Sequence, residues 1–276
     1  MAFLQTDNEL LLILQSSSDV LSVLNLSQSA AIVNNIRSQI SNSIPNSINA
    51  NALTAEFHLL QTTSESEFGT TSHRLNLIRL FNGVIRRTMA NNQTEMRHVV
   101  NEPNVIEIGS MRINAFRILR TFEGVIRRGS RDVEERMIGF SYLYLGLVDG
   151  VYRNSLRMCY IWEQLSHSHQ VNTTTVWQID IHTIRQYFVT NNFPLDYFEG
   201  WNNHVRNAVG HSTFSFDNTT NCMIYEDRRA PATVRLSEPE LIRLVQDLFS
   251  IYELILLQSQ ILRVNDVCDT FIQRYP

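Results

Sequence analysis

The sequence has 276 residues and no lysine, because all 23 of its basic residues are arginine. At average usage a chain of this length would carry about 15 lysines. Base composition does not explain the gap, since the 25 asparagines have codons as rich in adenine as those of lysine. Two explanations stay open. One is drift in an unusual lineage or deliberate replacement of every lysine. The other is selection against amine chemistry, such as tagging by a ubiquitin-like modifier.

Cysteine, glycine and proline are also scarce, with 3, 10 and 6 residues. The cysteines (Cys159, Cys222 and Cys268) lie far apart, which excludes a cysteine-only zinc cluster and argues against a disulfide framework. The low glycine and proline content excludes a collagenous or turn-dense all-β chain. A net charge of −4 argues against a protein that binds polyanions through bulk positive charge.

Targeting and cofactor signals are missing as well. No apolar run reaches the length of a membrane-spanning helix, so no membrane partner is expected. Asp7 and Glu9 precede the short apolar run Leu10–Leu14, whereas a secretory signal has a basic start and a longer apolar core. We therefore expect a cytoplasmic protein. No metal-ligand spacing and no glycine-rich phosphate loop occurs, so neither a metal nor a cofactor is expected.

Apolar residues recur at helical spacing along most of the chain, which predicts an all-α fold. We expect a helical bundle with a small β-hairpin or meander inserted before the last long helix. Residues 1–110 are predicted to form an N-terminal helical region, regulatory or dimerising, and residues 111–276 a second helical domain. The expected helices span Leu10–Leu26, Ile32–Ile40, Ala52–Gln61, His73–Met89, Met111–Arg127, Val133–Leu165, Ile179–Thr190 and Pro194–Gly210, with a long one after the capping box at Ser237. Expected non-helical parts are a break over Asn91–Ser110 with a β-like run at Val105–Ile108, and strands at Thr213–Phe216, Cys222–Tyr225 and Thr233–Leu236.

Two segments resemble each other at six of seven positions: Phe81-Asn-Gly-Val-Ile-Arg-Arg87 and Phe122-Glu-Gly-Val-Ile-Arg-Arg128. Arginines seven positions apart lie nearly on one stripe of a helix in each copy. The preferred interpretation is a packing motif at a helix end, where an arginine pair interacts favourably with the helix dipole. The alternative is a duplicated helix that contacts phosphate.

The segment Pro194–Gly210 carries the candidate site. Laid out as a helix at 100° per residue, it presents one apolar face and one polar face. On the polar face Arg206 and His211 flank a patch whose floor is Gly210 and Asn203. Asn207 precedes His211 by one turn, where its amide is placed to orient the imidazole.

Arg206-Asn-Ala-Val-Gly-His211 resembles the R-x4-6-H motif of the HEPN (higher eukaryotes and prokaryotes nucleotide-binding) superfamily, including the polar residue after the arginine. The layout of residues 111–276 is also similar to that superfamily. The resemblance implies a metal-independent endoribonuclease, often a toxin or an antiviral defence effector. In it, His211 would move the proton of the RNA 2′-hydroxyl or of the leaving 5′-oxygen. Arg206 would bind phosphate oxygens, and Asn207 would position the imidazole or the phosphate.

Only one such motif occurs in the chain, although this cleavage benefits from both a base and an acid. Members of the superfamily face two motifs across a dimer interface, so the resemblance implies a homodimer with a composite site and RNA as partner. An antitoxin or defence-system partner protein is also expected. The tyrosine that one toxin subgroup carries two positions after the histidine is Thr213 here, which argues against control by tyrosine modification. Candidate RNA contacts are Asn203, Gly210, Arg228 and Arg229.

Two other interpretations stay open. The chain is a non-catalytic HEPN-like module that binds nucleotide or RNA or scaffolds an assembly, or it is a helical interaction protein. In the latter, His211 would interact with the terminal carbonyls of its helix and Arg206 would be an ordinary solvated arginine.

Overall fold

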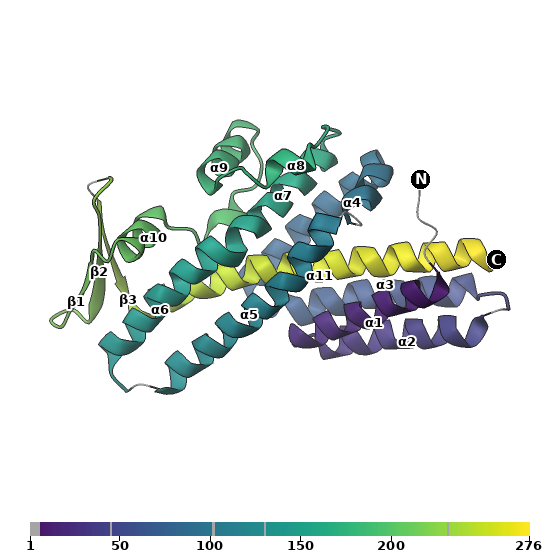
Figure 1. Cartoon of the computed structure of the whole chain (residues 1–276), viewed down its shortest axis with the longest axis horizontal. Coiled ribbons are helices and arrows are strands. Elements are labelled where there is room, and N and C mark those ends of the chain that lie inside the picture. The colour runs from purple at the N-terminus through teal and green to yellow at the C-terminus, as the bar shows by residue number, and fades with distance from the viewer. Residues whose placement is uncertain (1–5, 45, 101–102, 130, 231) are drawn as a thin grey trace. The chain divides into compact units, whose positions relative to one another are not determined.

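The computed structural model describes residues 6–44, 46–100, 103–129, 131–230 and 232–276. The described chain is mostly helical and carries one small antiparallel sheet, which confirms the predicted fold class (Figure 1). It divides into two compact units, Met1–Glu107 with Leu165–Ser168 and Glu253–Pro276, and Ile108–Gln164 with His169–Tyr252. The C-terminal residues therefore group with the N-terminal helices, unlike in the sequence-based division. In the described residues, no helix is both long and apolar enough to cross a membrane.

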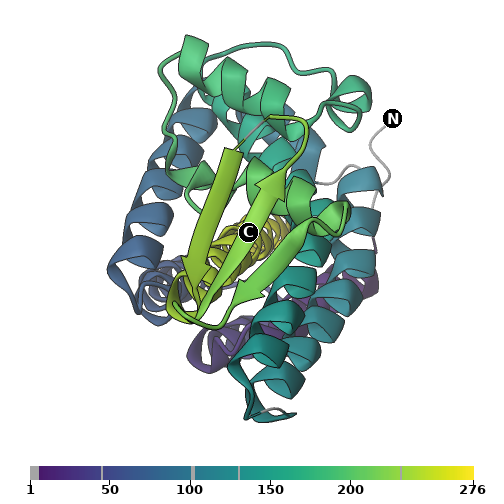
Figure 2. The ribbon, with the colours of Figure 1, turned by 90° about the vertical axis from the view of Figure 1, so that its left-hand side faces the viewer.

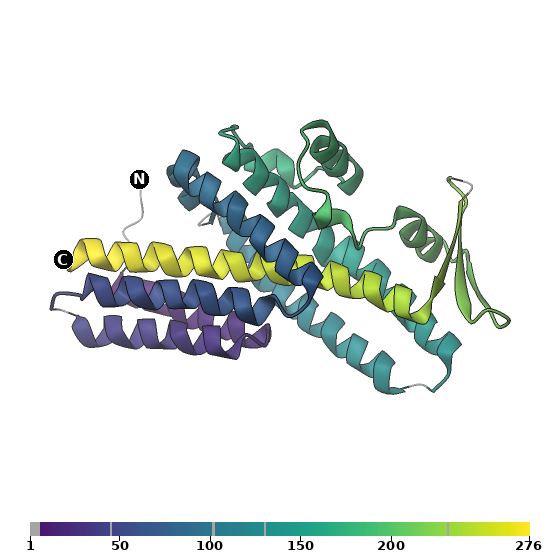
Figure 3. The same ribbon diagram turned by 180° about the vertical axis from the view of Figure 1, so that it is seen from behind.

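The first unit consists of packed helices. The last part of α11 lies beside α1 and α3 (Figures 1 and 3). Its core is aliphatic, and an ion pair of 3.0 Å joins Arg74 to the largely buried Glu253. The elements are α1 (Asp7–Val23), α2 (Ser27–Ser43), α3 (Ala50–Phe68), α4 (Ser72–Val100) and the last part of α11 (Glu238–Arg274).

The predicted break over Asn91–Ser110 is wrong except at its start, where Asn92 has a non-helical φ of −147° and ψ of 47° and α4 is kinked. Helix α4 continues to Val100, and α5 (Pro103–Gly129) begins at Pro103, so the β-like run Val105–Ile108 is helical. Proline suits the first helical turn, since its missing N–H would have no intrahelical partner there. The β propensity of a short run is a weak preference that the surrounding helix overrides.

The second unit contains a long helical run, as the apolar stretch from Val133 predicted. A π-helical turn interrupts it, in which the amide of Arg153 donates to the carbonyl of Val148. The run comprises α6 (Val133–Leu147), the π turn η1 (Val148–Tyr152) and α7 (Arg153–Ser166). Shorter helices follow as α8 (Thr173–Val176), α9 (Ile181–Thr190), the 3-10 turn η2 (Asp196–Phe198) and α10 (Asn203–Gly210).

The predicted meander is present as a three-stranded antiparallel sheet in the order β1-β2-β3 (Figure 2). Tyr225 on β2 pairs with Phe214 and Val234 on its two neighbours. The Tyr225 hydroxyl lies 2.7 Å from Ser141 Oγ of α6, so the sheet is attached to that helix. The strands are β1 (Phe214–Asp217), β2 (Cys222–Asp227) and β3 (Ala232–Ser237).

The predicted helix Pro194–Gly210 is wrong in its first half, where η2 and a bend precede α10. The bend follows from the close packing of Gly200. A Cβ atom there would lie 2.9 Å from Asp247 Cβ and 2.9 Å from the amide nitrogen of Leu248 on α11. Only glycine allows this approach between backbones.

Tyr144 of α6 holds the same bend. Its buried hydroxyl donates to the carbonyl of Gly200 at 3.0 Å and accepts from the amide of Asn202 at 2.6 Å. The Asn202 side chain in turn caps α10 by accepting from the amides of His204 and Val205. These contacts determine where α10 begins.

Substitution of Gly200 by alanine is expected to destabilise the protein by about 1–3 kcal/mol, because a methyl group would force α11 and the bend apart. Gly150→Ala in η1 is the matched control, since no atom lies within 4 Å of a Cβ there. Urea unfolding of both variants is the measurement. Equal stability of the two variants would contradict the packing argument.

Candidate functional site

Arg206 projects from α10 toward the π turn. Its Nε lies 3.2 Å from Oδ1 of Asp149 and its Nη2 lies 3.0 Å from Oδ2, a bidentate contact. Arg153 Nη2 reaches Oδ1 of the same carboxylate at 3.0 Å. Asp149 thus lies between two guanidinium groups, and its side chain is 36% exposed.

Asn207 connects Arg206 to the sheet. Its amide oxygen accepts from Arg206 Nη1 at 3.3 Å, and its amino group donates to Oδ2 of Asp227 at 3.1 Å. Asn207 is buried, and its side chain is committed to these two partners. The expected contact with the imidazole of His211 is not formed. The two residues are joined by a backbone hydrogen bond, in which the amide of His211 donates to the carbonyl of Asn207 at 3.0 Å.

Asp227, at the end of β2, is a buried carboxylate that holds a histidine. Its Oδ2 lies 2.9 Å from Nδ1 of His204, and its Oδ1 accepts from the amide of Arg229 at 3.0 Å. Burial alone would raise the pKa of the Asp227 carboxyl. The hydrogen bonds from Asn207, His204 and the amides of Arg229 and Ala230 outweigh it and lower the pKa to about 2.

An ionised Asp227 accepts the Nδ1–H of His204, which leaves Nε2 of that ring as a proton acceptor. The His204 side chain is 39% exposed. A buried carboxylate that orients an accessible imidazole is an arrangement suited to general base catalysis. Sequence reasoning gave His204 no role.

His211 ends α10 and is exposed. The amides of Ser212 and Thr213 donate back to the carbonyls of Val209 and Ala208 at 3.1 and 2.8 Å. Ser212 has a φ of 54°, so it takes the left-handed conformation that closes the helix. Within the described residues the imidazole of His211 has no hydrogen-bond partner, and the residue is exposed.

A cleft of about 180 Å³ lies beside Arg206. Asn203 also lines it, as predicted for the floor of the patch, but His211 and Gly210 do not. Arg206 and His211 therefore do not flank one patch, because Asp149 and Asn207 hold the Arg206 guanidinium toward η1 and away from the end of α10. The lining residues are Val148, Asp149, Arg153, Asp180, Ile181, His182, Trp201, Asn203 and Arg206.

Arg228 and Arg229 are exposed in the turn after β2. Because the amide of Arg229 bonds to Asp227, this turn is anchored to the same carboxylate as His204. These two arginines thus lie next to the series of hydrogen-bonded side chains that runs from Asp149 to His204.

Among the described residues, no group of three or more histidine, cysteine, aspartate or glutamate side chains is arranged to hold a metal ion.

No family model, curated protein or solved structure matches the chain. The assignment to the HEPN superfamily therefore remains a prediction from the motif residues, and the case for a function rests on their chemistry.

Two partners of the motif were missed because they come from elsewhere in the sequence, and His204 was missed on α10 itself. Asp149 and Asp227 lie 57 and 20 positions from the α10 residues they bind. The available signals were weak. Asp149 is an acidic residue within the apolar stretch after Val133, and His204 is a histidine three positions before Asn207.

The free energy of unfolding of the wild type is expected to fall relative to that of Asp227→Asn as the pH drops from about 4 to about 2. An aspartate in the unfolded chain has a pKa of about 3.9, whereas Asp227 in the folded state has a pKa of about 2. Its stabilisation is complete above the first value and is lost as the pH falls through the second. Urea unfolding at a series of pH values should show a relative loss of about 2 kcal/mol. Parallel pH profiles would contradict the assigned ionisation.

Proposed function

We propose that the chain is a metal-independent endoribonuclease that cleaves RNA by attack of the 2′-hydroxyl on the adjacent phosphate. The supporting observation is the hydrogen-bonded chain Asp149–Arg206–Asn207–Asp227–His204, which presents a guanidinium and an oriented imidazole from one short helix. In this proposal the protein acts in the cytoplasm as a toxin or defence effector, and a partner protein restrains it.

Arg206 would stabilise the phosphate. Asp149 accepts from Nε and Nη2 of the guanidinium and Asn207 accepts from Nη1, which leaves one N–H group on each terminal nitrogen for non-bridging oxygens. Charge builds on those oxygens in the transition state, where a preoriented cation is most effective. The contact with Asp149 keeps Arg206 in place before RNA arrives.

The two imidazoles of α10 would divide the proton transfers. Nε2 of His204 takes the proton of the 2′-hydroxyl, and the 2′-oxygen bonds to phosphorus. His211 then donates a proton as the bond between phosphorus and the 5′-oxygen breaks. The products are a 2′,3′-cyclic phosphate and a 5′-hydroxyl. His204 and His211 lie seven positions apart, about 10 Å along the axis of α10.

Substitution of Arg206, His204 or His211 by alanine is expected to lower the cleavage rate about 100-fold or more. The assay uses single-stranded RNA in EDTA and scores cyclic phosphate ends, with DNA of the same sequence as an uncleaved substrate. Arg185→Ala, an exposed arginine on α9, is the control. Unchanged melting temperatures must accompany each loss. Full activity of Arg206→Ala or His211→Ala would reject the proposed site.

The proposal includes a homodimer in which Arg206 and His211 of both protomers line one cleft. If so, mixing the inactive Arg206→Ala and His211→Ala proteins should restore cleavage, since mixed dimers would hold one intact copy of each group. Subunit exchange is verified by sedimentation. Mixed dimers without activity, or an active monomer at micromolar concentration, would place the whole site in one chain.

A non-catalytic RNA-binding or nucleotide-binding module is the second candidate. The bidentate contact of Asp149 with Arg206 favours it, because a guanidinium already paired with a carboxylate gives less stabilisation to the charge that builds on phosphate in the transition state. RNA binding by the wild type without cleavage in the assay above would support this module.

A further inference from the structure

The two copies of the repeated segment differ at one position, and the second copy shows what that position does. Glu123 of α5 is buried, at 8% exposure. It accepts from Arg120 Nη1 at 2.8 Å and from Nε and Nη2 of Arg127 at 3.0 and 2.8 Å. The Glu123 carboxylate is therefore paired with Arg120, three positions before it, and with Arg127, four positions after it.

The first copy, on α4, has the same arginines without the carboxylate. Asn82 takes the place of Glu123, and Arg79 and Arg86 stand three positions before it and four after it. The Arg79 guanidinium lies 3.8 Å from Glu65 of α3. Arg86 is exposed, and in the described part of the chain no hydrogen bond or ion pair engages it. The first copy thus presents a guanidinium where the second has an internal ion pair.

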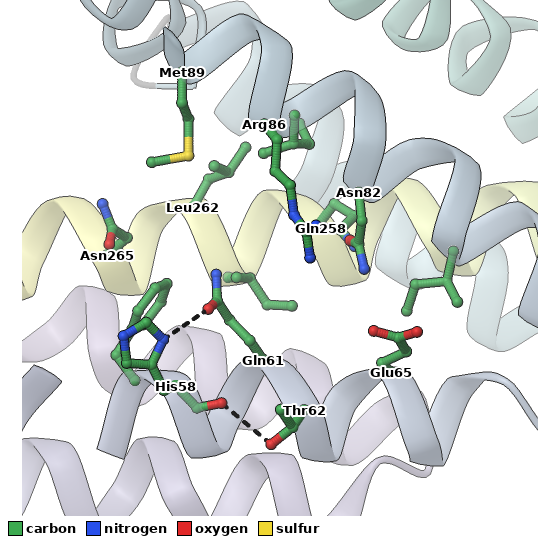
Figure 4. A pocket seen from close by; sticks show the side chains of 14 residues that line it. His58, Gln61, Thr62, Glu65, Asn82, Arg86, Met89, Gln258, Leu262 and Asn265 are labelled. Carbon is green, nitrogen blue, oxygen red and sulfur yellow. Dashed lines mark hydrogen bonds between the residues drawn. The ribbon is translucent and has the colours of Figure 1, made fainter. Parts of the chain in front are cut away.

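Arg86 projects into a cleft of about 420 Å³ lined by residues of α3, α4 and α11, all in the first unit. This volume is within the usual range for small-molecule sites. Figure 4 shows Arg86 and Asn82 extending from α4 toward α3, and the Glu65 carboxylate pointing back from the facing helix. The floor is apolar and includes Ile78, Ile85, Ile261 and Leu262, all buried.

An amide pair stands between the two charges. Gln258 of α11 is 4% exposed, and its amino group donates to the amide oxygen of Asn82 at 2.8 Å. Within the described residues this leaves the Asn82 amino group and the Gln258 carbonyl oxygen without partners. Around its apolar floor the cleft therefore offers a cation, a carboxylate, one amide donor and one amide acceptor, with His58, Gln61, Thr62 and Asn265 as further polar lining residues.

We infer that this cleft binds a small apolar zwitterion, of the class of free α-amino acids with apolar side chains. The ligand's carboxylate takes the place at Arg86 that Glu123 occupies at Arg127, and the Asn82 amino group donates to it. The ammonium group is bound by the Gln258 carbonyl oxygen on the side of Glu65, and the apolar side chain lies on the isoleucine and leucine floor. A ligand without a carboxylate would leave Arg86 without a partner, and one without an ammonium group would lose the contacts with the Gln258 carbonyl oxygen and Glu65. The inference is independent of RNA cleavage, because it concerns another unit of the chain.

Calorimetric titration of the full chain with three probes tests the inference. The probes are L-phenylalanine, 3-phenylpropionate without the ammonium group and phenethylamine without the carboxylate. Phenylalanine, or leucine and methionine in parallel titrations, is expected to bind, and the two single-charge analogues to bind about tenfold more weakly or worse. No binding of any amino acid at millimolar concentration, or equal binding of the analogues, would overturn it.

Two substitutions locate the binding. Arg86→Gln should weaken phenylalanine binding about tenfold or more, whereas Arg117→Gln, an exposed arginine of α5, should leave it unchanged. Asn82→Glu should place in the first copy the ion pair of the second, raise the melting temperature and abolish phenylalanine binding. Retained binding in Arg86→Gln or Asn82→Glu would overturn the assignment to this cleft.

Discussion

A carboxylate that stays ionised inside a fold must receive donors from several sides, because an unpaired buried charge is strongly unfavourable. At Asp227 the donors are His204, Asn207 and the amides of its own turn. Since His204 and Asn207 lie one turn apart on α10, a single carboxylate orients both side chains and ties the end of β2 to the helix. Through the Asn207 amide the same group also orients Arg206. The candidate site exists because this one charge has to be compensated.

The contacts of Asp227 and Asp149, at the two ends of this series of hydrogen-bonded side chains, differ in strength. The difference suits phosphate binding by Arg206. Asp227 is 3% exposed, so its hydrogen bonds are retained in a setting of low polarity. Asp149 is 36% exposed, and ion pairs at that exposure contribute little to stability. Arg206 can therefore exchange part of its contact with Asp149 for a phosphate at small cost, while Asn207 and His204 stay where Asp227 holds them. The π turn that carries Asp149 is a feature often found at functional sites.

Periodicity predicted those parts of the fold that local patterns control. The strand runs, the helical run after Val133 and α9 are read from adjacent residues. The failure at Pro194–Gly210 has a long-range cause, since Gly200 packs against a helix nearly fifty positions later in the chain. The same limit applies to the site. The motif and the exposure of its histidine follow from the end of one helix, whereas Asp149 and Asp227 join it only through the tertiary fold.

The repeated segment shows how one pattern supports two roles. In both copies the arginine four positions after the glycine folds back toward it. Arg128 Nε donates to the carbonyl of Gly124 at 2.9 Å, and a Cβ at Gly83 would lie 3.6 Å from Arg87 Nη1. The helix-dipole interpretation applies to the second copy only, because Arg128 lies in the last turn of α5 whereas the first copy lies within α4. The glycine–arginine contact thus accounts for what the copies share. The exchange of a buried glutamate for an asparagine accounts for their difference, since it converts a closed ion pair into an open cationic site.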